Sequence, residues 1–279
     1  MKKIALIFVS VVTILTAFAQ DNQHFLSLDL GGGMHTMLYK PTDGKWSANG
    51  GGLVQLKYQY IIKKGWGVGI GVGMSSLRSS SKYDYTVSLN GVHPDNNEPY
   101  TSTTAFKNWR EYQDMIAIDI PIQAFYNPIL TEKWSLLLGF GLTLDFPVWM
   151  QYSHNGGEYV MSGYFPSIHG TVENMPNHGF GITDTDYKGK IDHKVINVGA
   201  IVDFGALYNI AEKTDLYFGM YVNYQFLNTI NKSDTNMLEP STLGYTNALN
   251  SNKVDKVNPI EVGLKLGFRF NVSTVTSHK

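Results

Sequence analysis

Apolar and polar residues alternate strictly near the C-terminus of the chain. In residues 260–270, IEVGLKLGFRF, the even positions hold Ile, Val, Leu or Phe, and the odd positions hold Glu, Gly, Lys or Arg. A period of two is typical of a β-strand with one apolar face and one small or charged face. A tilted strand of this length can cross the hydrocarbon core of a bilayer.

The same alternation recurs along the chain and predicts eight two-faced strands. Residues 66–74, for example, place Trp66, Val68, Ile70, Val72 and Met74 on one face and glycines on the other. The remaining segments with this pattern are 26–30, 54–60, 116–126, 134–146, 194–210 and 214–226.

The glycine-rich stretch 65–74, GWGVGIGVGM, raises the question of a phosphate-binding loop. A dinucleotide fingerprint needs the spacing G-x-G-x-x-G at a turn from strand to helix, and this stretch has glycine at every second position instead. We interpret these glycines as residues that face a narrow lumen with no room for side chains.

Two architectures fit strands of this kind. In a membrane barrel the apolar faces point outward to lipid, and in a soluble ligand-binding barrel they point inward. The connections near 62–65, 127–133 and 209–214 are short, whereas those near 76–108, 147–193 and 227–258 are long. This alternation favours an all-β fold, an eight-stranded antiparallel transmembrane β-barrel with short periplasmic turns and long extracellular loops.

Aromatic residues near the strand ends support the membrane barrel, because such barrels carry aromatic girdles at both membrane interfaces. The predicted girdle residues are Tyr60, Trp66, Tyr126, Trp134, Tyr208 and Phe270.

The N-terminus predicts export. Lys2 and Lys3 precede an apolar stretch that is too short for a comfortable membrane span, and Ala17 and Ala19 give the spacing of a signal-peptidase site. We expect residues 1–19 to be a signal peptide and residues 20–279 to form the outer-membrane β-barrel, in the outer membrane of a Gram-negative bacterium.

Composition narrows the chemistry. The chain has 22 Lys and Arg against 23 Asp and Glu, so its charge predicts no nucleic-acid partner. It has no cysteine, which excludes disulfides and thiol chemistry.

Several segments resemble a known family. The signal ending TAFAQ and the segments IDIPIQAFYN, SLLLGFGLTLDF and NPIEVGLKLGFRF are similar to the outer-membrane β-barrel domain family common in Bacteroidetes, with its PorT-like and outer-membrane-protein-A-like branches. The resemblance implies location and fold more than activity. Residues NVSTVTSHK follow Phe270, a departure from barrels that end in an aromatic residue.

Charged residues on the polar faces are expected to fill the lumen, since an eight-stranded barrel is only wide enough for its own side chains. Buried charges require partners, so we expect a plug of ion pairs. The predicted lumen charge network is Asp29, Lys57, Asp119, Asp145, Asp203, Glu261, Lys265 and Arg269.

The long connections offer no catalytic or metal-binding pattern. His154, His169, His178 and His193 match no metal-ligand spacing and are expected to be solvated, and no Ser–His–acid spacing commits to a hydrolase. We therefore expect no enzyme activity, no metal and no cofactor.

The same connections are rich in aromatic residues, which suit a binding surface, an outer girdle or self-packed loops. These residues are Tyr83, Tyr85, Tyr100, Trp109, Tyr112, Trp149, Tyr152, Tyr159, Tyr164 and Phe165.

The sequence thus predicts a non-enzymatic barrel with a structural, adhesion or envelope-complex role. Its partners would be outer-membrane lipid and an extracellular or envelope protein or glycan held by the loops at 76–108, 147–193 and 227–258. The main alternative is a small passive pore for ions or small solutes. A loop-rim enzyme and a soluble ligand-binding barrel also remain open.

Overall fold

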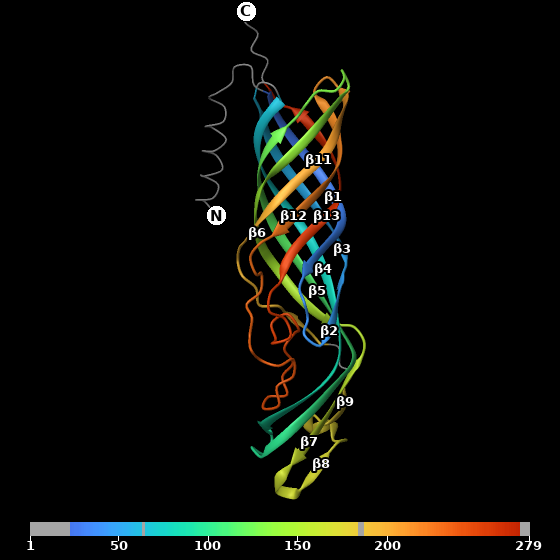
Figure 1. Ribbon diagram of the computed structural model, residues 1–279, viewed down its shortest axis with the longest axis vertical. Coiled ribbons are helices and arrows are strands. Elements are labelled where there is room, and N and C mark those ends of the chain that lie inside the picture. The colour runs from blue at the N-terminus through green and yellow to red at the C-terminus, as the bar shows by residue number, and fades with distance from the viewer. Residues whose placement is uncertain (1–22, 63–64, 184–186, 274–279) are drawn as a thin grey trace, which may run out of the picture.

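The computed structural model describes residues 23–62, 65–183 and 187–273 and shows an eight-stranded antiparallel β-barrel with a long extension at one end (Figure 1). Neighbouring strands in the ring are β1, β3, β4, β5, β6, β11, β12 and β13. Strand β13 then pairs with β1 from Phe25↔Asn271 to Leu38↔Asn258 and closes the sheet. The predicted signal peptide lies outside the described residues.

The ring strands differ greatly in length. Five of them, β1, β3, β11, β12 and β13, have 12 to 16 residues, whereas β4 and β5 have 27 and 28. The ring strands are β1 (Gln23–Leu38), β3 (Gly50–Ile61), β4 (Trp66–Val92), β5 (Pro99–Tyr126), β6 (Trp134–His154), β11 (Asn197–Ala211), β12 (Thr214–Gln225) and β13 (Asn258–Asn271). The remaining strands are β2 (Gly44–Ala48), β7 (Glu158–Phe165), β8 (Gly170–Val172), β9 (Gly181–Thr183) and β10 (Lys188–Lys190).

The outer wall of the barrel is apolar. Leu30, Leu264 and Leu266 are 62%, 68% and 61% exposed, an unusual degree for leucine on a protein surface. Equivalent residues along all eight ring strands complete one continuous apolar belt: Leu28, Leu56, Ile70, Val72, Ile122, Phe140, Leu142, Val202, Phe204, Met220, Val222 and Phe268. The apolar faces therefore point outward, as the membrane-barrel interpretation predicts.

The strand glycines of the 65–74 stretch, Gly67, Gly69, Gly71 and Gly73, face inward. A Cβ at Gly71 would lie 2.7 Å from Cγ of Lys57, and a Cβ at Gly69 would lie 2.7 Å from the ring of Phe125. Side chains in the lumen already occupy the volume that a larger residue at Gly69 or Gly71 would need, so glycine at these positions has a structural role in packing.

Aromatic residues of the predicted girdle gather at the end of the barrel that has the short turns. The rings of Trp66 and Tyr126 lie 4.7 Å apart, and those of Trp134 and Tyr208 lie 4.8 Å apart. Trp66, Trp134 and Phe270 are among the exposed large residues.

The predicted long loop at 76–108 is instead regular β-structure. Strands β4 and β5 continue together to a short tip at residues 93–98, and β7 adds to β5 along residues 101–107. We call the part of β4 and β5 beyond Leu77 and Met115, together with β7, β8 and β9, the blade. It projects from the barrel at the end opposite the short turns (Figure 1).

The blade was missed because the alternation changes phase where β4 leaves the apolar belt. In the barrel part of β4, before Ser75 in the sequence, the outward-facing even positions are apolar. In the blade the even positions are Lys82, Asp84, Thr86, Ser88 and Asn90. The inward-facing odd positions now carry the apolar groups, with Tyr83 fully buried. This inversion follows from a change of environment outside the sheet from apolar to aqueous.

A bulge on β5 keeps the interior of the blade continuous. The pairing shifts between Tyr83↔Trp109 and Tyr85↔Phe106, so β5 has one extra residue there. Asn108, in the bulge, has φ of 51°, a left-handed conformation that asparagine tolerates. The extra residue allows both Phe106 and Trp109 to point inward.

Among the described residues, no helix has the length and apolar character needed to cross a bilayer.

Leu264→Arg tests the direction of the belt. If the belt faces lipid, this substitution should lower the free energy of unfolding of the vesicle-embedded protein by about 2–4 kcal/mol. Heat-dependent gel mobility after folding into lipid vesicles measures the effect. The control is Ser88→Arg, which lies on an exposed blade strand outside the belt and should fold normally. Equal folding of both variants would contradict a lipid-facing belt.

Candidate functional site

The centre of the lumen holds a compact network of ion pairs. Lys57 Nζ lies 3.0 Å from Asp29 and 3.8 Å from Asp203, and Lys265 Nζ lies 2.7 Å from the other oxygen of Asp203. Gln123 donates to Asp203 at 2.7 Å. All four charged residues are at most 2% exposed. These four predicted lumen residues, from four different strands, lie together.

Arg269 forms a further ion pair at the end of the lumen with the short turns. Its Nη2 lies 2.7 Å from Asp215, and its Nη1 donates to Asn127 at 2.9 Å. The guanidinium also lies 4.1 Å from the ring centre of Phe25. Asp215 was not among the predicted lumen residues, although it has the same inward parity as Tyr217 on β12.

The other three predicted lumen residues form a separate acidic group closer to the blade. Asp119 and Asp145 lie directly opposite each other in the β5–β6 ladder. Ser75 donates to Asp119 at 3.2 Å and Thr143 donates to Asp145 at 2.9 Å. Among the described residues, no ion pair reaches Asp119, Asp145 or Glu261. The predicted single network is therefore three groups: the central ion-paired network, the separate Arg269–Asp215 pair and a group of carboxyl groups.

Little space remains in the lumen. A recess beside Asp29, Lys57 and Tyr217 has no room for a water molecule. A pocket of about 200 Å³ opens at the short-turn end, lined by Phe25, Asn127 and Arg269 among others. Within the described part of the chain, no cluster of three or more His, Cys, Asp or Glu side chains is arranged to hold a metal ion.

The end of the lumen nearest the blade is closed by apolar packing. The segment between β12 and β13, residues 226–257, folds over it, and we call this segment the cap. Ile230, Leu249 and Val254 of the cap are buried against Met115 and Leu77 of the strands. An apolar layer thus separates the acidic group from the surroundings of the blade.

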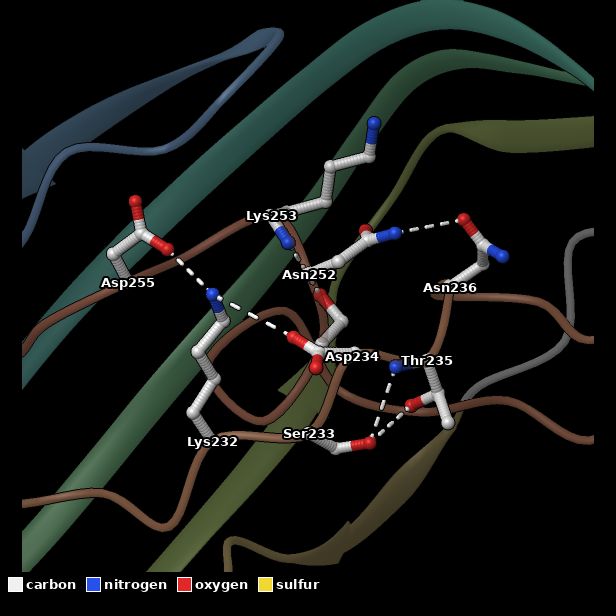
Figure 2. Close-up of polar contacts among 9 residues, drawn as sticks. Lys232, Ser233, Asp234, Thr235, Asn236, Asn252, Lys253 and Asp255 are labelled. Atoms are coloured by element: carbon white, nitrogen blue, oxygen red, sulfur yellow. Dashed lines mark hydrogen bonds and ion pairs between the residues drawn. The ribbon is translucent and has the colours of Figure 1, made fainter.

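Polar contacts within the cap hold its outer part together (Figure 2). Lys232 Nζ lies 2.6 Å from Asp255 and 3.8 Å from Asp234. Asn252 donates to Asn236 at 2.9 Å, which joins the two halves of the cap. On the inner side, Lys253 lies 3.0 Å from Asp43 and 3.9 Å from the ring centre of Tyr85.

Six of the ten aromatic residues predicted in the long connections are buried, five of them between the cap and the blade. Tyr83, Tyr100 and Trp109 are at most 2% exposed, in a cluster with Phe106, Tyr159, Phe165, Phe180 and Leu238. Tyr164, at 41%, and Trp149, at 38%, are the most exposed of the predicted set. Of the three roles considered for these aromatics, self-packing describes the buried majority.

His154 also belongs to this interior, so the prediction of a solvated side chain at this position was wrong. Its ring stacks on Trp109 with centres 3.7 Å apart, and its Nε2 lies 3.0 Å from the carbonyl oxygen of Gly156. His169 and His178 are exposed, and His178 lies 2.7 Å from Asp95.

Glu111 is the buried acidic residue that the sequence reading missed. It lies on β5 in the blade, beyond the apolar belt, and is fully buried. Its carboxylate accepts hydrogen bonds from Tyr245 at 2.7 Å, from the backbone N–H of Ala248 at 3.1 Å and from Gln113 at 2.9 Å. Two of these donors belong to the cap, so Glu111 fastens the cap to the blade. Glu111 has the same odd, inward-facing parity as Gln113 and Met115 on β5, and this parity could have predicted its burial.

Burial raises the pKa of Glu111 to about 7, against the opposing effect of its hydrogen-bond donors. When the cap is released, the carboxyl group enters water and returns to its ordinary pKa near 4.5. Between pH 4.5 and about 7, Glu111 is therefore protonated when the cap is closed and ionised when the cap is released.

Comparison with known proteins adds little to this description. No family model matches the chain, and no curated protein matches it at a significant level. Neisserial surface protein A is 14% identical, covers 90% of this chain and 99% of its own, and has a TM-score of 0.36. OprG from Pseudomonas aeruginosa is 13% identical, with coverages of 91% and 96% and a TM-score of 0.41.

A third solved structure is Ail of Yersinia pestis, an attachment invasion locus protein, in complex with the heparin analogue sucrose octasulfate. It is 11% identical, with coverages of 89% and 99% and a TM-score of 0.28. Likeness at this level carries no argument about function, and the barrel is established by its own strand pairing.

Lys265→Met tests the central network. Loss of this cation leaves Asp203 buried with one cation, Lys57 at 3.8 Å, and should lower the free energy of unfolding by about 3–5 kcal/mol. Denaturant unfolding of the lipid-embedded protein measures the change. Lys107→Met is the control: its pair with Glu158 is solvent-exposed, and its loss should change stability by less than about 1 kcal/mol. Similar effects from both variants would refute a stabilising role for the network.

The pKa of Glu111 predicts a pH-dependent cap. Its protonated form favours closure, so this contribution is full below about pH 4.5 and is lost as the pH rises through about 7. Hydrogen exchange of residues 226–257, corrected for intrinsic rates, should show weaker protection at about pH 8 than at about pH 5. Glu111→Gln should remove this dependence. Equal protection of the wild-type cap at both pH values would show that Glu111 does not control it.

Proposed function

We propose that the protein is a non-enzymatic outer-membrane barrel with a structural, adhesion or envelope-complex role, exerted through its blade and cap. One observation carries this proposal: the lumen of the barrel is filled and capped, whereas its two longest strands, β4 and β5, extend beyond the barrel. The ion pairs of Lys57, Asp203 and Lys265 occupy the lumen, and the cap covers its end. A barrel of this form offers a surface rather than a passage.

Outer-membrane placement rests on the apolar belt and on the backbone pairing of the closed ring. Within lipid, every strand needs hydrogen-bonded neighbours, and a closed barrel satisfies this need. The expected signal peptide provides for export, and the sequence resemblance to PorT-like Bacteroidetes barrels agrees with a Gram-negative outer membrane. The short turns would then lie in the periplasm and the blade outside the cell.

The distal part of the blade is the surface proposed to meet a protein or glycan partner. Several large apolar side chains are exposed there, on or between the short strands β7, β8 and β9 and at the end of β4. They are Val92, Tyr164, Ile168, Met175 and Ile182. Exposed apolar groups concentrated at one end of a molecule are typical of an interaction site.

A small passive pore is the second candidate, favoured by one observation. Asp119, Asp145 and Glu261 lie in the lumen without an ion pair among the described residues, and carboxyl groups of this kind line cation pathways. The ion pairs on one side of this group and the apolar layer on the other argue against continuous flow.

Conductance in planar lipid bilayers separates the two candidates. The inserted wild-type protein should give no steady current, because both barriers remain in place. Replacement of cap residues 229–256 by a short Gly-Asn turn should also remain silent, since the ion pairs persist. The same replacement combined with Lys57→Ala and Lys265→Ala should conduct. Steady wild-type current proportional to the amount of inserted protein would overturn the proposal in favour of the pore.

A further inference from the structure

The blade has one open edge. On the side of β4 away from β5, strand β3 pairs with residues 67–76 and β2 pairs with residues 79–83. Beyond Tyr83, β4 pairs with β5 alone, as far as Val92. We propose that this open edge, residues 84–92, pairs antiparallel with the same edge of a second copy of this chain.

The alternation of hydrogen bonds along β4 shows which backbone N–H and C=O groups point out of the open edge. The N–H of His93 donates to the carbonyl oxygen of Glu98 on the β5 side at 2.9 Å. In an antiparallel ladder, residues two apart point their backbone groups the same way, so odd residues of β4 bond to β5. The N–H and C=O groups of Thr86, Ser88, Asn90 and Val92 therefore point away from the sheet. None of them has a partner in the backbone bonds found outside the ladders of the described residues.

The edge lacks the features that normally prevent strand addition. Residues 85–92, YTVSLNGV, contain no charged residue and no proline, and they alternate as a strand should. Natural proteins usually protect open edges with lysine, proline, bulges or a covering segment. The cap does not cover this edge, because it packs on the inner face of the blade: Tyr100 donates to the carbonyl oxygen of Pro240 at 2.8 Å.

The opposite edge of the blade shows the contrast. The outer side of β7 is paired with β8 and β9, each only three residues long. Very short strands are poor templates for further pairing. The sheet therefore has one edge suited to addition, and a second copy joined there leaves no long edge open. Such a self-complementary contact closes as a two-fold dimer and does not extend into a fibre.

The chemistry of the edge suits a second copy. Apart from Asp84 at its base, the edge carries no charge, so it meets its own copy without like-charge repulsion. The outward side chains Thr86, Ser88 and Asn90 would face one another across the new ladder. Thr, Ser and Asn form favourable cross-strand hydrogen bonds in such pairs. A charged partner peptide would find no complementary charge here.

Antiparallel pairing also fixes how the two copies are arranged. The two-fold axis is perpendicular to the sheet, so the two β4 strands run in opposite directions and the two barrels lie at opposite ends of the joint blade. With the barrels in membranes, the dimer would join two facing membranes. This consequence rests on the proposed outer-membrane placement, whereas the pairing itself does not.

Sedimentation of the full chain in detergent tests the pairing. The wild type should show a concentration-dependent equilibrium between monomer and dimer. Ser88→Pro removes an N–H that only the new ladder would use, and Ser88→Lys places like charges on both copies. Each variant should weaken the dimer by about tenfold or more, since a homodimer carries the change twice.

Thr103→Lys is the matched control. Thr103 lies beside Ser88 on the same outward face, with their hydroxyl oxygens 2.9 Å apart, but it belongs to β5 and not to the open edge. This variant should dimerise like the wild type. A monomeric wild type at all concentrations would overturn the proposal, as would equal weakening by Ser88→Lys and Thr103→Lys, which would indicate contact through the face.

Vesicle clustering tests the antiparallel arrangement. Vesicles that contain the wild type should aggregate in light scattering, and vesicles with Ser88→Pro should stay dispersed. Dimers in detergent without clustering of vesicles would overturn the antiparallel geometry. Conductance does not depend on this edge, so a silent lumen together with failed association would reject the dimer and leave the proposed function standing.

Discussion

Closure of the sheet by β13 against β1 is the constraint on which the rest of the molecule depends. The long ladder from Phe25↔Asn271 to Leu38↔Asn258 gives both end strands a second neighbour. A surface as apolar as the belt around Leu30 and Leu264 can be placed in lipid only if no backbone group of the strands is left unpaired there. Closure meets that condition, and it also limits the width of the lumen.

The narrow lumen explains two features that look unrelated in the sequence. Glycine at 69 and 71 leaves room for the side chains of Phe125 and Lys57, which come from neighbouring strands. The charges that remain inside are then held within contact distance of one another, as Lys57 and Lys265 are around Asp203. Small residues and paired charges are two solutions to one packing problem, and together they fill the barrel.

Outside the belt the same strands follow a different rule. Water surrounds the blade, so its outward residues are polar and its apolar groups turn inward, where Trp109 and Tyr100 pack beneath the cap. Glu111 joins the cap to this interior through Tyr245 and Ala248. The phase inversion leaves a sheet with a polar outer face and one unprotected edge, and the proposed dimer depends on that edge. Barrel and blade are therefore one sheet divided between two environments.

The sequence by itself determined the local part of the structure. A period of two reports which side of a strand each residue occupies, because successive side chains point to opposite faces. From that pattern came the eight ring strands, the outward apolar belt and the inward position of Asp29, Lys57 and Asp203. The same parity, followed further along β5 and β12, marks Glu111 and Asp215 as inward residues as well.

Only the tertiary structure decided which inward residues meet. Parity gives the face of a residue but neither its height in the barrel nor its partner, since those depend on the register and tilt of all strands together. The eight predicted lumen charges thus divide into a paired network of four, an acidic group of three, and Arg269, which pairs with Asp215 rather than with another predicted residue. The blade and the burial of Trp109 under the cap were likewise beyond local pattern, because the cap comes from a segment more than a hundred residues away along the chain.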